Sequence, residues 1–149
     1  MVTITKATAA DAEDIIALQK LAYQSEAKLY NDYSLPPLTQ TLESLQGEFE
    51  NSIILKAVLA GKIIGSVRGR VESTVCKVGR LIVHPEFQRQ GIGSRLLLQL
   101  ENHFTGVKFE LFTGSKSLGN IRLYQRHGYC VSGNQSVSEG LSLIFLTKG

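Results

Sequence analysis

The fold is decided by one stretch of the sequence, Val78-Gly79-Arg80-Leu81-Ile82-Val83-His84-Pro85-Glu86-Phe87-Gln88-Arg89-Gln90-Gly91-Ile92-Gly93-Ser94-Arg95-Leu96-Leu97. It begins as a strand, which His84-Pro85 ends, and it closes as an amphipathic helix that starts near Gly91. The connection between them carries the pattern Gln88-x-x-Gly91-x-Gly93. A strand, a polar loop with two glycines and a helix together predict an anion-binding site.

The physical basis of that prediction is the start of the helix. The first backbone N–H groups of a helix have no partner within it, and they carry the positive end of its dipole. Because Gly91 and Gly93 have no side chains, a phosphate can approach these donors closely. Arg89 and Arg95 can add positive charge. The alternative is a helix start whose two glycines serve packing only.

Two other phosphate-binding motifs do not fit this stretch. A mononucleotide P-loop needs Gly-Lys-Ser/Thr, which is absent. A dinucleotide-binding fold needs Gly-x-Gly-x-x-Gly directly after a strand. Here the six residues Pro85–Gln90 lie between the strand and the first glycine, and position 96 is leucine.

Composition limits the class of protein. The length of 149 residues fits one domain, residues 1–149, and the hydrophobic fraction of 43% is ordinary for a globular protein. The net charge of +3 is too small to indicate nucleic acid as a partner. No apolar run approaches the length of a membrane span. The N-terminus lacks a signal-peptide core and the two cysteines are far apart, so we expect a cytoplasmic protein.

The rest of the chain predicts a mixed α/β fold, with an antiparallel first half and a strand-helix-strand crossover in the middle. Period-2 alternation and turn residues separate the strands, and apolar stripes mark the helices. The predicted strands are Val2–Lys6, Ile53–Ala60, Ile63–Glu72, Val75–His84, Val107–Thr113, Tyr129–Ser132 and Leu141–Thr147. The predicted helices run from Asp11 to near Glu26, over Leu38–Phe49, from Gly91 to Phe104 and over Asn120–His127.

Two motifs of this sequence resemble those of the GNAT superfamily of acetyl-CoA-dependent N-acyltransferases. The central stretch is similar to the family's Arg/Gln-x-x-Gly-x-Gly/Ala motif after a strand. Downstream, Asn120-Ile121-Arg122-Leu123-Tyr124-Gln125-Arg126-His127-Gly128-Tyr129 is similar to its Asn…Leu-Tyr…Gly-Phe/Tyr helix. The resemblance covers roughly residues 2–147. It implies a mainly antiparallel central sheet that splays at the cofactor site and is flanked by helices.

The resemblance also implies roles for the residues of both motifs. Backbone groups of Ile82 and Val83 would pair with the pantetheine arm of acetyl-CoA, and Asn120 would contact the cofactor near that arm. Tyr124 would lie near the thioester sulfur. The residues implied at the pyrophosphate are Gln88, Arg89, Gln90, Gly91, Ile92, Gly93 and Ser94.

Acetyl transfer by direct attack of an amine needs a base, an oxyanion donor and an acid for the leaving thiolate. The N–H of Val83 can stabilise the oxyanion. Tyr124 is the candidate acid because the pKa of a phenol, about 10, lies near that of a thiol. The alternative is that Tyr124 packs as a core aromatic residue. Glu72 is the candidate base: some family members carry a glutamate before the loop, but that position is Lys77 here. There are two alternatives. Glu72 is only an exposed charge at the end of a hairpin, or a chain of waters serves as the base.

The acceptor is expected to bind between two polar connections, Tyr23–Pro37 and Ser132–Gly140, because binding residues concentrate on loops held by a scaffold. A plain surface connection is the alternative for the first segment. The candidate acceptor residues are Tyr23, Glu26, Tyr30 and Asp32.

The sequence therefore predicts an N-acetyltransferase that uses acetyl-CoA and acts on a small-molecule amine or on a peptide or protein amine. The three histidines fit no metal-ligand spacing, so no metal is expected. No nucleic acid and no membrane are expected as partners, and a homodimer is left open. A non-catalytic domain that binds or senses acyl-CoA is the alternative function. An interaction module without cofactor is a third class, against which the intact Gln88–Ser94 loop argues.

Overall fold

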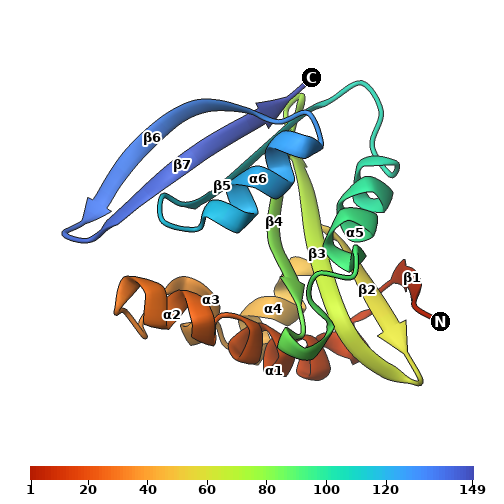
Figure 1. Ribbon diagram of the computed structural model, residues 1–149. Helices are drawn as coiled ribbons and strands as arrows, with labels where there is room; N and C mark the ends of the chain where they lie inside the picture. The colour runs from red at the N-terminus through yellow and green to blue at the C-terminus, as the bar shows by residue number, and fades with distance from the viewer.

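The computed structural model describes residues 1–149 and shows one seven-stranded sheet between two groups of helices (Figure 1). The strands lie in the order β1-β2-β3-β4-β5-β7-β6, and only β4 and β5 are parallel neighbours. This confirms the predicted mixed α/β class with a mainly antiparallel sheet. The strands are β1 (Thr3–Lys6), β2 (Ile53–Leu59), β3 (Lys62–Glu72), β4 (Val75–Val83), β5 (Lys108–Gly114), β6 (Cys130–Ser138) and β7 (Leu141–Lys148).

The helices divide between the two faces of the sheet. In Figure 1, α1 to α4 lie along the lower side of the view, and α5 and α6 lie higher, beside β3 and β4. Short 3-10 helices at Ala9–Asp11 and Pro85–Phe87 precede α1 and α5. The α-helices are α1 (Ala12–Ala22), α2 (Gln24–Tyr30), α3 (Pro36–Thr39), α4 (Leu42–Glu48), α5 (Ile92–Glu101) and α6 (Leu118–Arg126).

The larger core forms where α5 lies on β3. The glycines of β3 let the helix come close: a Cβ at Gly65 would lie 3.0 Å from Leu96 Cδ1, and one at Gly69 would lie 3.2 Å from Leu100 Cδ1. Both leucines are fully buried. The apolar stripe that predicts this helix is therefore its contact face, and burying such leucines stabilises the fold by roughly 1.5–3 kcal/mol for each side chain.

A second, smaller core lies on the opposite face of the sheet. Ile15 and Ile16 of α1 pack there with Leu45 of α4 and Ile54 of β2. Since β2 alternates its side chains, the neighbouring Leu55 points instead into the core under α5. The sheet thus separates two apolar layers, which explains why the neighbouring residues Ile54 and Leu55 of β2 are both buried.

The segment Tyr23–Pro37 differs from its prediction as a connection without regular structure. It contains α2 and the start of α3, and α2 ends at Asn31, whose φ of 50° is left-handed. Only Ala27 of α2 is buried, so the helix shows no apolar stripe in the sequence.

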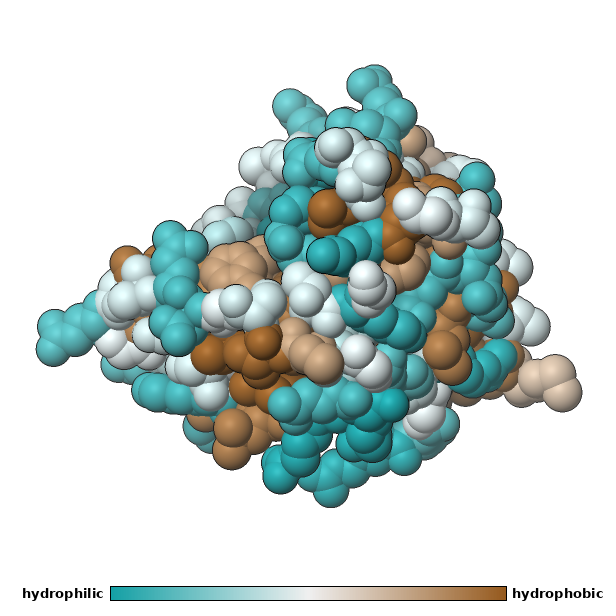
Figure 2. All heavy atoms as spheres, turned by 90° about the horizontal axis from the view of Figure 1, so that it is seen from above, coloured by the Kyte–Doolittle hydropathy of each residue, from teal (hydrophilic) through white to brown (hydrophobic).

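The segment Ser132–Gly140 also differs, because most of it is strand β6 rather than a loop. Every residue of β6 except Gly133 is exposed, so the sequence lacks the alternation of a half-buried strand. With β7 it forms a hairpin that reaches out beyond the helices (Figure 1). Seen from above, the molecule shows its hydrophobic residues in separate patches among hydrophilic ones (Figure 2).

Strands β4 and β5 separate soon after they meet. Their parallel pairing covers three residue pairs only, from Val75 with Lys108 to Lys77 with Glu110. Beyond that point β4 stays paired with β3 as far as Val83, while β5 stays paired with β7. The sheet therefore opens between its two central strands, on the side where β4 leads into α5.

A β-bulge accompanies this opening. Arg68 and Ser66 of β3 lie opposite Gly79 and Ile82 of β4, so β4 carries two residues where β3 carries one. One of the two, Arg80, has a φ of 51°, which is rare for a residue with a side chain. A bulge bends its strand and increases the local twist, which turns the end of β4 away from β5.

Helix α2 is fastened to the far side of the opening through Tyr30. The Tyr30 hydroxyl lies 2.8 Å from Ser117 Oγ and accepts a hydrogen bond from the Lys116 N–H at 2.9 Å. A Cβ at Gly114 would lie 1.9 Å from this hydroxyl oxygen. Glycine at the end of β5 therefore leaves the space that the tyrosine ring fills.

We predict that Gly114→Ala destabilises the protein by about 1–3 kcal/mol, because the methyl group overlaps a ring held by two hydrogen bonds. Urea unfolding measures the change in the free energy of unfolding. The control is Gly47→Ala in α4, where a Cβ meets nothing within 4 Å, and this change should stabilise by roughly 0.5–1 kcal/mol. If the penalty persists in a Tyr30→Ala background, the ring is not its cause.

Candidate active site

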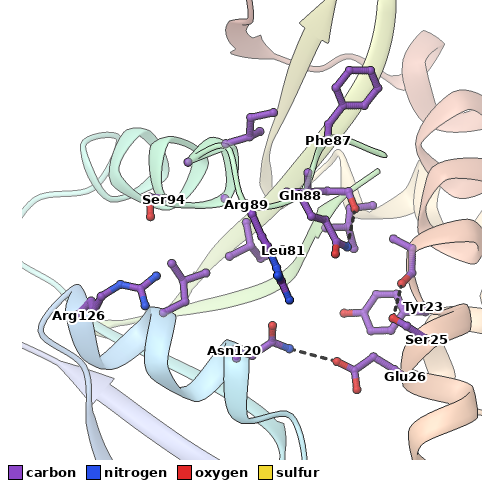
Figure 3. A pocket seen from close by; sticks show the side chains of 18 residues that line it. Tyr23, Ser25, Glu26, Leu81, Phe87, Gln88, Arg89, Ser94, Asn120 and Arg126 are labelled. Carbon is purple, nitrogen blue, oxygen red and sulfur yellow. Dashed lines mark hydrogen bonds between the residues drawn. The ribbon is translucent and has the colours of Figure 1, made fainter. Parts of the chain in front are cut away.

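A cavity of about 370 Å³ lies at the opening between β4 and β5. Its walls come from the α1–α2 junction, the end of β4, the loop before α5, the first turn of α5 and the inner side of α6 (Figure 3). Most of the sequence-predicted residues meet here. Those that line it are Tyr23, Glu26, Ile82, Val83, Gln88, Arg89, Gly91, Ile92, Gly93, Ser94 and Asn120.

The loop after β4 is held by two local hydrogen bonds. His84 Nδ1 accepts the Glu86 N–H at 3.1 Å, which caps the 3-10 turn, and Gln88 Nε2 donates to the Val83 carbonyl at 3.3 Å. The next residue, Arg89, has a φ of 63°, and its side chain reaches into the cavity (Figure 3). Gln88 thus fixes the loop, and Arg89 brings a charge to the cavity.

The first turn of α5 presents free backbone donors. Gly91 is the N-cap residue, with a φ of 80°, and no side chain caps the helix there. The first helical hydrogen bond runs from the Arg95 N–H to the Gly91 carbonyl at 3.1 Å. The N–H groups of Ile92, Gly93 and Ser94 precede that bond, and all three residues line the cavity.

Packing does not explain the two glycines of the motif. A Cβ at Gly91 would meet nothing within 4 Å, and one at Gly93 would meet its nearest neighbour at 3.7 Å, an ordinary contact. Gly91 is required by its left-handed backbone. Gly93 has a helical backbone, so its missing side chain leaves space on the cavity side of the helix. This space favours a ligand that approaches the helix start.

The charge of the cavity wall is mainly positive. Arg89 and Arg126 line it, and Glu26 is the only carboxylate among the lining residues. The expectation that Arg95 adds charge here does not hold, because its Nη2 donates to the Val2 carbonyl at 3.1 Å on the other side of α5. Arg126 takes its place. Spacing could have found Arg126, since it follows the lining residue Leu123 by three positions on α6.

Glu26 joins the two sides of the opening. Its carboxylate accepts hydrogen bonds from Ser117 Oγ at 2.8 Å and from Asn120 Nδ2 at 3.2 Å, and the second bond is drawn in Figure 3. Asn120 Nδ2 also lies 3.3 Å from Thr113 Oγ1 of β5. The sequence predicted Glu26 only as a loop residue that binds the acceptor substrate. In the structure it is part of a hydrogen-bond network between α2, β5 and α6.

Tyr124 lies behind the cavity wall, with its side chain 7% exposed and its ring 5.9 Å from that of Tyr129. Burial, followed by the nearby Tyr23 and Glu26, raises the pKa of the Tyr124 phenol. The hydroxyl therefore keeps its proton throughout the neutral range. Tyr124 belongs to the core under α5, and Leu123, the residue before it on α6, lines the cavity.

Besides Tyr124, four predicted residues lie outside the cavity wall. Gln90 is exposed in the loop, and Asp32 accepts two hydrogen bonds from Ser34 on the surface. Tyr30 fastens α2, as described above. Glu72 lies at the β3–β4 turn, exposed and paired with Arg70 at 3.2 Å, at the opposite end of β4 from the cavity. The structure does not bring Glu72 to the other site residues.

Several cavity residues were missed because their types are common in cores or loops. They are Ala22, Ser25, Leu81, Phe87, Gly119, Leu123 and Arg126. No three histidine, cysteine or carboxylate side chains gather where they could hold a metal ion. None of the helices combines the length and the apolar composition needed to cross a lipid bilayer.

Comparison with known proteins gives consistent results. A family model described as the Acetyltransferase (GNAT) family matches residues 14–129. The UPF0157 protein YqkA of Bacillus subtilis (strain 168) is 28% identical over 134 residues, which make up 89% of this chain but only 38% of that relative. The chain therefore corresponds to well under half of YqkA.

Solved structures show the same fold at low identity. The PaiA N-acetyltransferase of Thermoplasma acidophilum, in complex with coenzyme A, has a TM-score of 0.82 at 19% identity, covering 99% of this chain and 98% of that one. The ribosomal-protein-S18-alanine N-acetyltransferase of Escherichia coli has a TM-score of 0.80 at 18% identity, covering 99% and 93%. YncA of Salmonella typhimurium, a putative acetyltransferase with acetyl-CoA, has a TM-score of 0.78 at 20% identity, covering 99% and 92%.

The family model covers most of the chain and includes both the glycine loop and the helix that carries Asn120 and Tyr124. The splayed sheet and the open start of α5 are features of the residues that it matches. This chain belongs to the GNAT family of acetyltransferases.

Proposed function

We propose that this protein is an N-acetyltransferase that transfers the acetyl group of acetyl-CoA to an amine in a ternary complex. The observation that carries the proposal is the first turn of α5, where three backbone N–H groups and two cavity arginines face one space. Such a site suits a pyrophosphate. Two similar structures contain coenzyme A or acetyl-CoA, which supports the same ligand class here.

The divergence of β4 and β5 supports a place for the pantetheine arm. Ile82 and Val83 line the cavity beyond the last residue pair between the two strands. The Val83 carbonyl accepts from Gln88 Nε2, and the other backbone groups on that side are available to a ligand. An extended arm with amide groups can pair with such a strand as an added strand would.

Acetyl-CoA supplies a thioester whose carbonyl carbon the amine attacks. The bond from nitrogen to carbon forms, the bond from carbon to sulfur breaks, the amine loses a proton and the thiolate gains one. We propose that Glu26 takes the amine proton, directly or through water, because it is the only carboxylate in the cavity wall. This assigns to Glu26 the role that the sequence suggested for Glu72.

Tyr124 is proposed as the donor to the departing thiolate. Its proton is retained at neutral pH because burial raises its pKa. The same shift weakens the phenol as an acid, so its service is mainly a hydrogen bond to the charge that develops on sulfur. A preorganised donor of this kind stabilises a transition state more than a ground state.

Acetyl-CoA turnover over a panel of amines, read by thiol release, tests the proposal. Acetylation of an amine with matching loss of acetyl-CoA supports it. Tight binding of acetyl-CoA without turnover of any amine would favour the alternative, a domain that binds or senses acyl-CoA.

We predict that acetyl-CoA raises the melting temperature, and that Gly91→Glu abolishes this shift by filling the anion site with negative charge. At 100 times Kd, binding stabilises the folded state by about 2.7 kcal/mol. Gly61→Glu is the matched control, because Gly61 has a φ of 79° and open space around it, as Gly91 does, but lies at the β2–β3 turn. A Gly91→Glu protein that folds and keeps the full shift would contradict the assignment.

We predict that Tyr124→Phe lowers kcat by roughly 10²–10³, the usual effect of removing one preorganised hydrogen-bond donor. The KM for acetyl-CoA should change little, because the ring and its contacts in the core remain. Steady-state kinetics under conditions where chemistry limits the rate give both values. A normal kcat would show that the thiolate leaves without this hydroxyl.

We predict that Glu26→Gln lowers kcat/KM for the acceptor by at least roughly 10², because glutamine keeps the size of the side chain but cannot accept a proton. Asp32→Asn is the matched control, since it removes a surface carboxylate outside the cavity. The loss should shrink at high pH, where more of the amine is already neutral. Equal losses in both variants would remove Glu26 from the mechanism.

A further inference from the structure

A second cavity, of about 480 Å³, lies on the face of the sheet that α4 covers. It begins where β4 and β5 separate, and its walls include α4, β3, β4 and Phe112 of β5. The first cavity extends from the start of α5 and from α6, past the end of β4, to the α1–α2 junction. The two cavities share no lining residue, and both include residues of β4. Four of the residues that line the second one are basic: Arg68, Arg70, Lys77 and Arg80.

Arg68 is a buried guanidinium with an unused donor. The residue is 4% exposed, and its Nη1 donates to Glu48 Oε2 at 3.0 Å and to Gln40 Oε1 at 3.2 Å. Its Nη2 donates to Gln19. Its Nε is buried and has no partner. An arginine side chain cannot give up its proton in a protein, so this donor stays both charged and unsatisfied.

Arg80 provides a second guanidinium in the same state. Its Nε is buried without a partner, and the side chain forms no ion pair. Its backbone is the left-handed residue of the bulge in β4, with a φ of 51°. Strained backbone of this kind persists where the surrounding structure demands a particular side-chain direction, and it is common at binding sites.

The charges around this cavity are unevenly compensated. Arg68 pairs with Glu48, Arg70 with Glu72 and Lys77 with Glu110, which leaves Arg80 without a carboxylate. Arg68 lies opposite Gly79, the residue before Arg80. Burial lowers the pKa of Arg68, Glu48 raises it, and the charge of Arg80 lowers it further. Two guanidiniums with unfilled N–H donors therefore lie here, and only one carboxylate, that of Glu48, pairs with them. Burying this excess of positive charge is unfavourable unless an anion binds.

The arginine pair lies next to the first cavity along strand β4. Arg80 directly precedes Leu81 on β4, and Leu81 lines the first cavity. Tyr23 and Glu26 line the first cavity, and the two arginines line the second. A small molecule could thus place an amine toward Glu26 and an anionic group toward the arginines.

We propose that the acceptor is an amine that also carries an anionic group, a carboxylate or a phosphate, and that Arg80 and Arg68 bind this group from the α4 side of the opening. The inference rests on the proposed function, because it names the substrate class of the same site. Planar guanidiniums bind carboxylate and phosphate oxygens through paired hydrogen bonds, and the two free Nε–H groups supply donors for such bonds.

The test compares matched acceptors in the acetyl-CoA assay with the unchanged protein. L-alanine and L-glutamate are compared with their amides, O-phosphoethanolamine with ethanolamine, and spermidine serves as an acceptor without an anion. The anionic member of at least one pair should have a kcat/KM roughly 10- to 100-fold higher, which corresponds to hydrogen bonds with a charged group. The pair that shows the preference distinguishes carboxylate from phosphate.

Substitution of Arg80 assigns the preference to this site. Arg80→Ala should raise the KM for the anionic acceptor by at least 10-fold and leave the KM for its neutral partner and for acetyl-CoA unchanged. Arg80→Lys keeps the charge but loses the fork, so its effect should be intermediate. The control is Arg122→Gln, an exposed residue two positions from Asn120 and therefore on the other side of α6.

The outcomes separate the two levels of the proposal. Acetylation of spermidine and neutral amines with no preference for the anionic partners overturns the inference and leaves the proposed function standing. A preference that Arg80→Ala does not reduce also overturns it. If no amine is acetylated although acetyl-CoA binds, the proposed function fails, and this inference fails with it.

Discussion

The short pairing between β4 and β5 is the constraint on which the rest of the structure depends. Three residue pairs hold the strands together, and past Lys77 and Glu110 each strand is bonded only to its outer neighbour. Backbone N–H and C=O groups at the centre of a sheet need partners. The opening is therefore a place where a ligand with an extended, amide-containing chain can supply what the protein leaves out.

The opening is kept by contacts that are distant in the sequence. Tyr30 and Glu26 of α2 reach across to Ser117 and Asn120, and the bulge at Arg80 turns the end of β4. These contacts join segments about 90 residues apart. A closed sheet would satisfy more backbone hydrogen bonds, so the fold gives up some local stability to keep a preformed site.

The sequence predicts those parts of the fold and site that depend on local physics. The glycine loop, the stripe of α5 and the pair Asn120 and Tyr124 depend on spacing alone, and the structure has them on the elements expected. The part of strand β6 beyond Ser132 was missed because its residues are exposed on both faces, and Arg126 was missed because nothing local distinguishes it from a surface charge. Glu72 was chosen by its proximity in sequence, whereas Glu26 reaches the cavity through tertiary structure.

Strand β6 has a consequence for how the protein behaves at high concentration. It is the last strand of the sheet, and from Cys130 to Ser138 it contains no charge and no proline, the residues that usually protect an open edge. Its protection comes from shape, because the register with β7 shifts twice, once between Val131 and Gly133 and once between Ser136 and Ser138. Each shift interrupts the regular row of donors and acceptors that another strand would need. The irregular edge is thus a poor template for pairing with another strand, although no side chain from Cys130 to Ser138 is charged.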